Sequence, residues 1–412
     1  MGEPCTTKIY VNSEQIFIIN PTISINKKIG NHTKVTIKGI VQSESHELAV
    51  SIESMAELEI WMEEKRAPLF CGLTTYVDVQ VKKSGGEQYQ ELYLEAMSYT
   101  CLMDKKKKYA AFQKRNVPYE EILDIVLAGY EDVQYLFGSQ MSKRTLDRFV
   151  VQYEETDWQF IARIASIVGV PLVVCHNLAG IRFTMGAFWG EDNYRIPKAE
   201  ESAVEEIHGE FFYIEWHTDN PAAPVFEVGD GITYLGFEGY VKEAELLIKD
   251  YILSQDCVIC RKDQFYISEI QNPFITGLSL PGKVQAVKGN QLKVTLDIDA
   301  IKDTECWFVY STFYSTFYCM PEEGDRINLY FPNHTEDDAF VLNSVRSAPG
   351  EITFNGGETS RGASAESVGG TTVPQGSSSP SSSGATASGN ASGGQKPEEI
   401  KLNGNDIKMN EE

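Results

Sequence analysis

The sequence predicts a mainly β protein that carries an α/β insertion and is divided into several domains. Three observations support this prediction. The chain has 412 residues, which is too long for one hydrophobic core. Short runs with β-branched or alternating apolar residues recur along most of the chain, as expected for strands. Strong helical periodicity is found only between Pro118 and Val168.

Residues 1–108 contain several short strand-like runs separated by turn signals such as Gly30-Asn31 and Gly85-Gly86. We expect this segment to form a small barrel or rolled sheet, with a short helix over Ser54–Glu63. The expected strands are Lys8–Val11, Gln15–Ile19, Lys34–Val41, Leu48–Ile52, Thr74–Lys82 and Tyr89–Met97.

Residues 109–204 are expected to form a small α/β module with two helices. Pro118–Gly129 has a proline near its start, apolar residues at helical spacing and a glycine at its end. The second helix, Asp157–Val168, follows an N-cap at Thr156 with Gln159 three residues later, which predicts a capping box. Its expected apolar face contains Phe160, Ile161, Ile164, Ile167 and Val168. Gly169 should end the helix, and Leu172–Cys175 should be a buried strand.

Residues 205–275 return to strand-like patterns and are expected to form a second barrel. The tight turn Gly229-Asp230-Gly231 should join two of its strands. The expected strands are Phe211–Trp216, Pro224–Val228, Gly231–Tyr234, Gly239–Leu247 and Tyr251–Cys257.

Residues 276–348 are expected to form a third β unit. Leu292, Val294, Leu296 and Ile298 alternate without a break after a hairpin turn at Gly289-Asn290. About five strands in about 70 residues correspond to the size of an OB-fold.

The C-terminal composition changes abruptly after the third β unit. Residues 349–397 are rich in Ser and Gly and are expected to be a flexible linker. Residues 398–412 alternate again on either side of an Asn-Gly-Asn turn and are expected to form a short β-helix-like tail.

The net charge of −23 argues against a general nucleic-acid binder, which needs a basic face for phosphate contacts. Between Glu191 and Glu245, 14 acidic residues face three basic ones. This excess indicates either a solvated surface or an acidic wall that lines a cavity or channel. The basic block Lys105–Lys108 indicates either a solvated loop or a contact to an acidic partner. No apolar run reaches the length of a membrane span, and no signal peptide is expected.

No catalytic or metal-binding arrangement is evident in the sequence. The motifs HExxH and GxSxG and the P-loop do not occur, so no catalytic, cofactor-binding or metal-binding residue is assigned. Cys257 and Cys260 form an isolated CxxC, which fits ordinary strand cysteines better than a zinc or redox site. Asp157 is interpreted as a first-turn helix residue rather than a catalytic acid. Adjacent carboxylates, Glu154 with Glu155 and Glu205 with Glu206, should point apart.

Several motifs resemble the hub proteins of contractile injection machines, meaning phage baseplate hubs and the VgrG spike proteins of type VI secretion. The main one reads Gln-Tyr-x-Glu-x-Asp-Trp-x-Phe over residues 152–160 and continues as Ile-Ala-Arg-Ile-Ala. Pro68–Gly72 is similar to a step in the first hub barrel, and Gly229-Asp230 is similar to the opening of the second. Pro321–Asp325 and Ala339–Val345 resemble the OB domain that follows the hub.

The resemblance implies a late control protein D-like hub fused to an OB-fold spike domain. The implied function is structural: a homotrimeric hub-spike that joins a tail tube to a puncturing tip, without enzyme activity or cofactors. The implied partners are the tube protein, other baseplate proteins, a PAAR-like tip protein or effector cargo, and the target envelope on firing. Assembly is expected in the bacterial cytoplasm, within a virion, a tailocin or a secretion-system baseplate.

Two alternative functions are kept open. One is a spike-associated peptidoglycan hydrolase, although the position where some spikes carry a lysozyme domain holds only the Ser/Gly linker here. The other is an OB-fold module that binds oligonucleotides or oligosaccharides through the aromatic residues Phe313, Tyr314, Phe317 and Tyr318. Lys and Arg are absent between Cys306 and Asp325, so barrel packing or a trimer interface explains these aromatics better.

Overall fold

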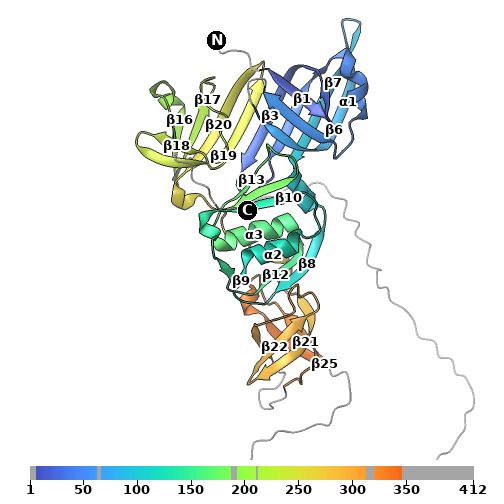
Figure 1. The fold of residues 1–412 in the computed structure, drawn as a ribbon, viewed down its shortest axis with the longest axis vertical. Helices are drawn as coiled ribbons and strands as arrows, with labels where there is room; N and C mark the ends of the chain where they lie inside the picture. Colours follow the sequence, from blue (N-terminus) through green and yellow to red (C-terminus); the bar gives the residue numbers. More distant parts are fainter. Residues whose placement is uncertain (1–5, 63–65, 187–192, 210–211, 312–319, 346–412) are drawn as a thin grey trace, which may run out of the picture. The chain divides into compact units, whose positions relative to one another are not determined.

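The computed structural model describes residues 6–345, except for 63–65, 187–192, 210–211 and 312–319 (Figure 1). The chain divides into two units, Met1–Thr353 and Phe354–Glu412. All described residues belong to the first unit. The predictions for the linker at 349–397, for the tail at 398–412 and for the four aromatics between 313 and 318 lie outside the described residues.

The largest sheet has thirteen strands in the order β16-β17-β20-β19-β3-β4-β7-β6-β5-β1-β2, with β18 paired to β19 and β15 paired to β18. Its strands are β1 (Thr7–Val11), β2 (Glu14–Ile16), β3 (Ile18–Lys28), β4 (Lys34–Val41), β5 (Glu57–Met62), β6 (Phe70–Ser84), β7 (Glu87–Ser98), β15 (Asn193–Arg195), β16 (Val204–His208), β17 (Phe212–Thr218), β18 (Gly231–Tyr234), β19 (Phe237–Lys249) and β20 (Ile252–Cys260).

One strand pairing joins the segments predicted as two barrels. β19 pairs with β3 in antiparallel register from Glu243 opposite Lys28 to Ile248 opposite Ile23. Alternation along these strands places Ile23, Ile25 and Leu246 in one buried core. Strands from 1–108 and 205–275 therefore belong to a single sheet, and β15, from the predicted α/β segment, also adds to it. The domain boundaries given above stay a prediction.

The α/β module surrounds the helix that the sequence predicted best. α3 (Asp157–Val168) is buried on nearly all sides, rather than on one face as expected, and Phe160, Ile161 and Ile164 are fully buried. The other regular elements here are β8 (Lys107–Phe112), β9 (Val117–Pro118), α2 (Tyr119–Leu127), β10 (Val133–Phe137), β11 (Thr145–Leu146), β12 (Val150–Thr156), β13 (Leu172–Val174) and β14 (Ile181–Met185).

The last described part is a five-stranded sheet in the order β23-β22-β21-β24-β25. An isolated bridge between Tyr310 and Val341 brings its two outer strands together. Its core also takes in Ala111, Phe149 and Val151 from the α/β module. The strands are β21 (Ser279–Lys288), β22 (Gln291–Leu296), β23 (Trp307–Val309), β24 (Arg326–Tyr330) and β25 (Phe340–Val345). The mainly β fold class with an α/β insertion is therefore confirmed, and the OB-fold assignment stays a prediction.

Three element predictions were wrong. The run predicted as strand Leu48–Ile52 forms a short helix, α1 (His46–Ser51), and the helix predicted over Ser54–Glu63 is instead strand β5. Pro224–Val228 forms no strand. The remaining short elements are 3₁₀ turns, η1 (Ser43–Ser45), η2 (Tyr99–Asp104), η3 (Ser139–Met141), η4 (Lys198–Ala203), η5 (Lys262–Gln264), η6 (Pro273–Ile275) and η7 (Glu336–Asp338).

Candidate functional site

The residues of the 152–160 motif build the start of α3. The Thr156 hydroxyl accepts a hydrogen bond from the Gln159 backbone N–H at 3.2 Å, and the Gln159 side chain accepts one from the Thr156 N–H at 3.0 Å. The predicted capping box is therefore present. At the other end, Gly169 adopts a left-handed conformation with φ of 71°, which lets the helix stop there.

Asp157 is fully buried, and its carboxylate holds neighbouring elements together. It accepts hydrogen bonds from the Gln152 amide at 3.0 Å and from the Tyr130 hydroxyl at 2.6 Å. Lys108 lies 2.5 Å from the same carboxylate. The Asp157 carboxylate is therefore bound by three side chains of the protein, and this geometry supports a structural role for the residue.

The Arg163 ion cluster, made of Arg163, Glu155 and Glu336, links α3 to the five-stranded sheet. The buried guanidinium donates to both Glu155 carboxylate oxygens at 2.7 Å, to Glu336 at 2.9 Å and to the Val151 carbonyl at 2.6 Å. Glu336 belongs to η7, between β24 and β25. A bidentate Arg–carboxylate pair fixes both distance and orientation, so this cluster fixes how the two parts meet.

Trp158 packs between parts of the chain that are far apart in sequence. Its ring centroid lies 4.7 Å from that of His32 and 5.9 Å from that of Phe183. His32 in turn lies 2.7 Å from both Thr100 and Asp104. The motif tryptophan is therefore a packing residue at the boundary between the large sheet and the α/β module.

A second charge cluster, in which Lys27 and His176 are buried and Glu227 is partly exposed, joins three segments. The Lys27 ammonium donates to the Phe226 carbonyl at 2.9 Å and to Glu227 at 2.7 Å. The ring of His176, from the loop after β13, lies 3.3 Å from the other Glu227 oxygen. Partial burial would raise the pKa of the Glu227 carboxyl, but the charge of Lys27 outweighs it and, together with His176, lowers that pKa to about 2.

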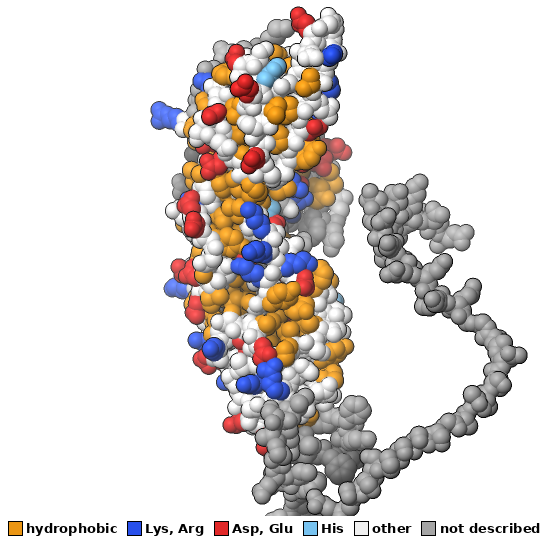
Figure 2. Space-filling view, turned by 90° about the vertical axis from the view of Figure 1, so that its right-hand side faces the viewer, with side chains coloured by type: hydrophobic (Ala, Val, Ile, Leu, Met, Phe, Trp, Pro, Cys, Tyr) orange, Lys and Arg blue, Asp and Glu red, His pale blue; other side chains and the backbone are white. Residues whose placement is uncertain are grey.

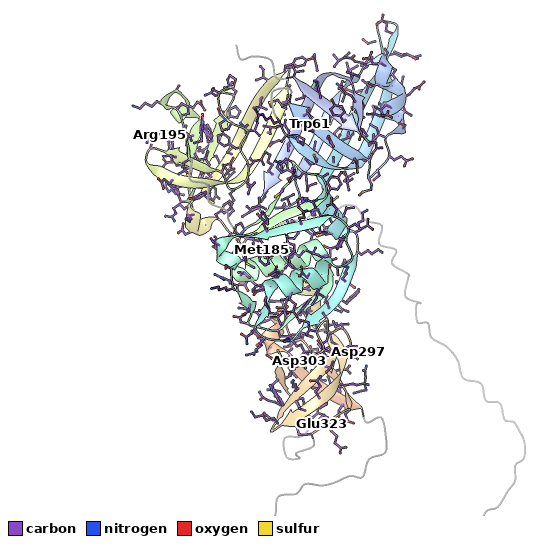
Figure 3. All side chains as sticks on the ribbon, in the orientation of Figure 1. Trp61, Met185, Arg195, Asp297, Asp303 and Glu323 are labelled. Carbon is purple, nitrogen blue, oxygen red and sulfur yellow. The ribbon has the colours of Figure 1, made fainter. Side chains whose placement is uncertain are left out.

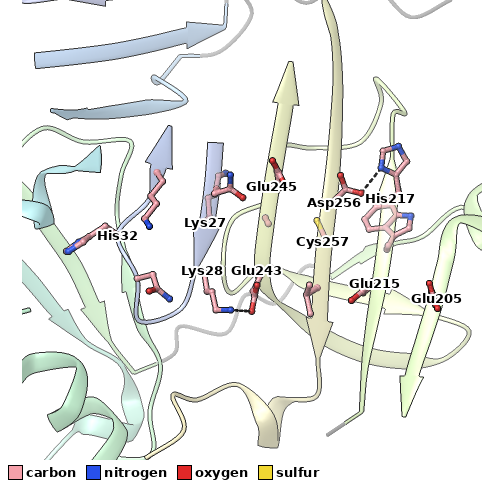
Figure 4. Close-up of a pocket in the computed structure, with 16 residues that line it drawn as sticks. Lys27, Lys28, His32, Glu205, Glu215, His217, Glu243, Glu245, Asp256 and Cys257 are labelled. Carbon is pink, nitrogen blue, oxygen red and sulfur yellow. Dashed lines mark hydrogen bonds and ion pairs between the residues drawn. The ribbon is translucent and has the colours of Figure 1, made fainter. Parts of the chain in front are cut away.

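The acidic face is a hollowed region on the solvent side of β16, β17, β20, β19 and β3 (Figure 4). It forms a groove of about 770 Å³. Lys28 partly neutralises it, 2.6 Å from Glu243, and the His217 ring lies 2.7 Å from Asp256. The carboxylates that line the groove are Glu205, Glu215, Glu243, Glu245 and Asp256. Most of them come from the acid-rich segment 191–245. Its composition indicated either a solvated surface or an acidic wall that lines a cavity or channel.

The other residues that were weighed for chemistry lie apart. Glu154 is half-buried and lies 3.2 Å from Lys107, whereas Glu155 is buried against Arg163, so the two carboxylates have different partners. They are separated by a β-bulge, at which Glu154 adopts a φ of 52°. Cys257 and Cys260 are buried in different apolar clusters. No group of three or more His, Cys, Asp or Glu side chains within the described ranges is arranged to hold a metal ion.

The basic block Lys105–Lys108 is only partly a loop, because β8 begins at Lys107. Lys107 lies over the Phe274 ring, and Lys108 contacts both Asp157 and the Tyr130 ring. Half of this block therefore stabilises the α/β module itself.

On the face shown in Figure 2, basic, acidic and apolar side chains are interleaved.

Sequence reasoning missed both charge clusters. Their partners are far apart in the chain: Arg163 and Glu336 are separated by 173 positions, and Lys27 and Glu227 by 200. The only signal was the presence of a charged residue within an otherwise apolar helix, the arginine of Ile-Ala-Arg-Ile-Ala.

Comparison with known proteins identifies the central part of this fold. A family model described as "Phage tail baseplate hub (GPD)" matches residues 31–178, from the start of β4 through the capped motif to the loop after β13. Residues 31–178 are therefore similar in sequence to the phage tail baseplate hub family. No curated protein matches the chain significantly.

Solved structures share the fold of this hub domain and its neighbouring sheets. The E. coli c3393 protein, described as a type VI secretion component similar to the T4 tail proteins gp27 and gp5, aligns with a TM-score of 0.61 at 13% identity, covering 82% of this chain and 99% of its own. A Francisella PdpA-VgrG complex aligns with a TM-score of 0.53 at 9% identity, covering 85% and 79%. The predicted resemblance to baseplate hubs and VgrG proteins is thus confirmed at the level of domain and fold.

Proposed function

We propose that this protein is a structural hub-spike subunit of a contractile injection apparatus, such as a phage tail, a tailocin or a type VI-like device. In this proposal, three copies assemble around one axis and join the tail tube to the puncturing tip. The baseplate hub domain at residues 31–178 is the observation that carries the proposal. The described part of the chain includes no helix that is long and apolar enough to cross a membrane.

The large sheet offers a physical route to the trimer. Eight strands from β16 to β6 follow one another in unbroken antiparallel order. At one end, β16 pairs only with β17 among the described strands. At the other end, β5 pairs with β6 only as far as Leu73, so no described strand pairs with the outer edge of β6 over residues 76–84.

The outer edges of β6 and β16 have strand directions that allow them to pair with each other between neighbouring copies. Eight is an even number, so β6 and β16 run in opposite directions, and β6 of one copy can continue the antiparallel order onto β16 of the next. Unpaired edges of this length otherwise invite uncontrolled association, so closure into a ring would protect them. A head-to-tail contact that closes after three steps gives a trimer with three-fold symmetry.

Ring closure would also give the acidic face a role. The groove shows that the solvent side of these strands is hollowed (Figure 4). In the proposed ring, the side of the sheet that carries the groove faces the axis, so the carboxylates would line the central channel. A channel with this charge repels polyanions from its wall and lets them pass without binding.

In this function the protein performs no bond chemistry. It transmits the thrust of the tube by being rigid, and the Arg163 ion cluster fixes the five-stranded sheet to the α/β module for that purpose. Its partners would be the tube protein, other baseplate proteins and a PAAR-like tip or effector cargo, with assembly in the bacterial cytoplasm. Release of muropeptides from peptidoglycan by the purified protein would contradict the non-enzymatic part of this proposal.

Cross-linking between the two edges tests the trimer contact. Gln80→Cys on β6 and Glu206→Cys on β16 lie at opposite ends of the eight-strand run, roughly 30 Å apart within one copy at ordinary strand spacing. Oxidation of the double variant should give covalent dimers and trimers, because the bond can form only between copies. Each single variant is the matched control for the native cysteines. A second set of double variants, with the Cys positions shifted by one or two residues, allows for a different strand register. If none of the double variants gives more covalent product than the single variants, the edge contact is contradicted.

A further inference from the structure

The end of β8 is joined to the segment that follows β22. The Ala111 N–H donates to the Ile298 carbonyl, and the Ala300 N–H donates to the Ala111 carbonyl, both at 2.9 Å. Together they form an isolated parallel bridge between Ala111 and Asp299. This contact, here called the β8 junction, attaches the five-stranded sheet directly to a strand of the hub domain.

One carboxyl group lies at the centre of the β8 junction. Asp299 accepts hydrogen bonds from the Leu296 backbone N–H at 2.6 Å and from the Gln113 side-chain amide, whose nitrogen is 2.8 Å from each carboxylate oxygen. Across the described ranges, no Lys, Arg or His nitrogen forms an ion pair with Asp299. Its negative charge is therefore held by neutral donors alone.

The amide that faces this carboxylate has an unused acceptor. Gln113 is fully buried, and its side-chain oxygen Oε1 has no hydrogen-bond partner in the structure. A buried acceptor without a donor is unfavourable, and a carboxylate cannot supply one. A protonated carboxyl can, because its O–H would donate to Gln113 Oε1 while its other oxygen accepts from Gln113 Nε2. The pair would then make two complementary hydrogen bonds after a small rotation of the amide.

We propose that Asp299 and Gln113 form a proton-binding site that makes the β8 junction tighter as the surroundings become more acidic. A single proton completes the hydrogen bonding of both side chains. No other group has to move.

The ionisation of Asp299 agrees with this geometry. Burial raises the pKa of the Asp299 carboxyl from 3.8 to about 6, against the opposing effect of the hydrogen bonds from Gln113 and Leu296. Because the folded-state pKa is raised, the stabilisation is fully present below the ordinary pKa near 4 and is lost as the pH rises through about 6. From pH 5 to pH 7.5 the equilibrium constant for opening the junction should rise about tenfold.

The other ionisable groups around the junction have partners of their own. Arg326 binds Asp297 through two contacts of 2.8 and 2.6 Å, and Lys114 lies 3.9 Å from Asp303. The Glu305 carboxylate accepts from the Arg115 backbone N–H at 3.2 Å. The Cys306 thiol donates to the Gln113 carbonyl at 3.1 Å, and burial raises its pKa. Asp297 and Asp303 lie on the same domain (Figure 3) and provide exposed controls.

The test compares the full-length protein with Asp299→Asn, whose amide can both donate to and accept from Gln113 at every pH. Hydrogen exchange of the backbone amides at 111–113 and 298–300, corrected for intrinsic rates, measures opening of the junction. We expect opening to become about tenfold more frequent in the wild type between pH 5 and 7.5, and no such change in Asp299→Asn. The control Asp297→Asn should keep the wild-type pH dependence.

Two results would overturn the proposal. One is an equal pH dependence in the wild type and in Asp299→Asn. The other is junction exchange in the wild type that stays constant between pH 5 and 7.5, a result that does not depend on whether the variant folds.

Discussion

At the scale of single residues, the hub motif is an arrangement of buried polar contacts. Asp157 bonds Gln152 and Tyr130, and Arg163 bonds Glu155 and Glu336. Polar side chains at this depth are stable only when their bonds are complete. The motif therefore specifies how the elements around α3 meet.

Arg163→Met should destabilise the protein by about 3–5 kcal/mol, because it leaves Glu155 and Glu336 as buried charges without their partner. Methionine keeps most of the side-chain volume, so the loss would report the ion cluster rather than a cavity. Chemical denaturation at neutral pH measures the change. Arg148→Met, at a half-exposed surface pair, is the matched control and should change the stability by less than about 1 kcal/mol. Equal effects of the two substitutions would contradict the assigned role of Arg163.

Trp158→Ala should lower the free energy of unfolding by about 3–5 kcal/mol, since the ring is buried between His32 and Phe183. Trp307, on strand β23, is 38% exposed and makes a suitable comparison. Trp307→Ala should have a clearly smaller effect in the same denaturation experiment. If Trp158→Ala were nearly neutral, the packing described for α3 would be incorrect.

Single-residue features were predictable only where both partners lie close in the sequence. The capping box of Thr156 and Gln159 spans three positions and could be read directly. The Arg163 ion cluster could not, because Glu336 lies in η7, 173 positions further along the chain. The same holds for Asp299 and Gln113, whose side chains are 186 positions apart.

At the scale of elements, a helix or strand was predicted correctly when its sequence segment was long enough to show a clear period. α3 was predicted with the correct ends, because twelve residues with a cap and a terminal glycine give a clear signal. Leu48–Ile52 is a short apolar run, and periodicity cannot show whether a run of this length is a helix or a strand. The helix formers in Ser54–Glu63 concealed the alternation of Leu58 and Ile60, both buried in β5.

Most of β3, from Asn20 to Lys28, was missed for a different reason, because the expected strand Gln15–Ile19 covers only its first two residues. Pro21 lies within the strand, and the register with β4 shifts between Ile19 and Thr22. Proline at such an irregularity is tolerated because no ladder hydrogen bond is needed from it there. The expected strand stops two positions before Pro21, whereas β3 continues through it to Lys28.

The contact between β3 and the loop that follows Phe226 should depend on pH through Glu227. Lys27 and His176 lower the pKa of this carboxyl from 4.5 to about 2. Because the folded-state pKa is lowered, the stabilisation is present above the ordinary pKa and is lost as the pH falls from about 4.5 toward 2.

Glu227→Gln should therefore destabilise the protein at pH 7 and approach the wild-type stability as the pH falls toward 2. Urea unfolding midpoints at a series of pH values measure this convergence. Glu243→Gln removes an exposed partner of Lys28 and should cause a smaller, salt-sensitive loss at pH 7. A Glu227→Gln deficit that persists unchanged at the lowest pH would rule out an ionic origin.

At the scale of the whole molecule, the continuous sheet is the feature that composition and periodicity could not reveal. The pairing of β3 with β19 joins residues more than 200 positions apart, such as Ser24 and Glu245. Strand patterns indicate which residues face a core, but they do not identify the neighbour of an edge strand. The resemblance to baseplate hubs supplied the expected symmetry, and the proposed trimer contact uses the edges of β6 and β16 that no described strand pairs with.

The mass of the full-length protein in solution tests the trimeric hub most directly. Mass photometry or light scattering at physiological salt should give about 138 kDa, three times the chain mass of 46.1 kDa, with three-fold symmetry in averaged electron micrographs. A single species of about 46 kDa that stays monomeric at micromolar concentration would contradict the account.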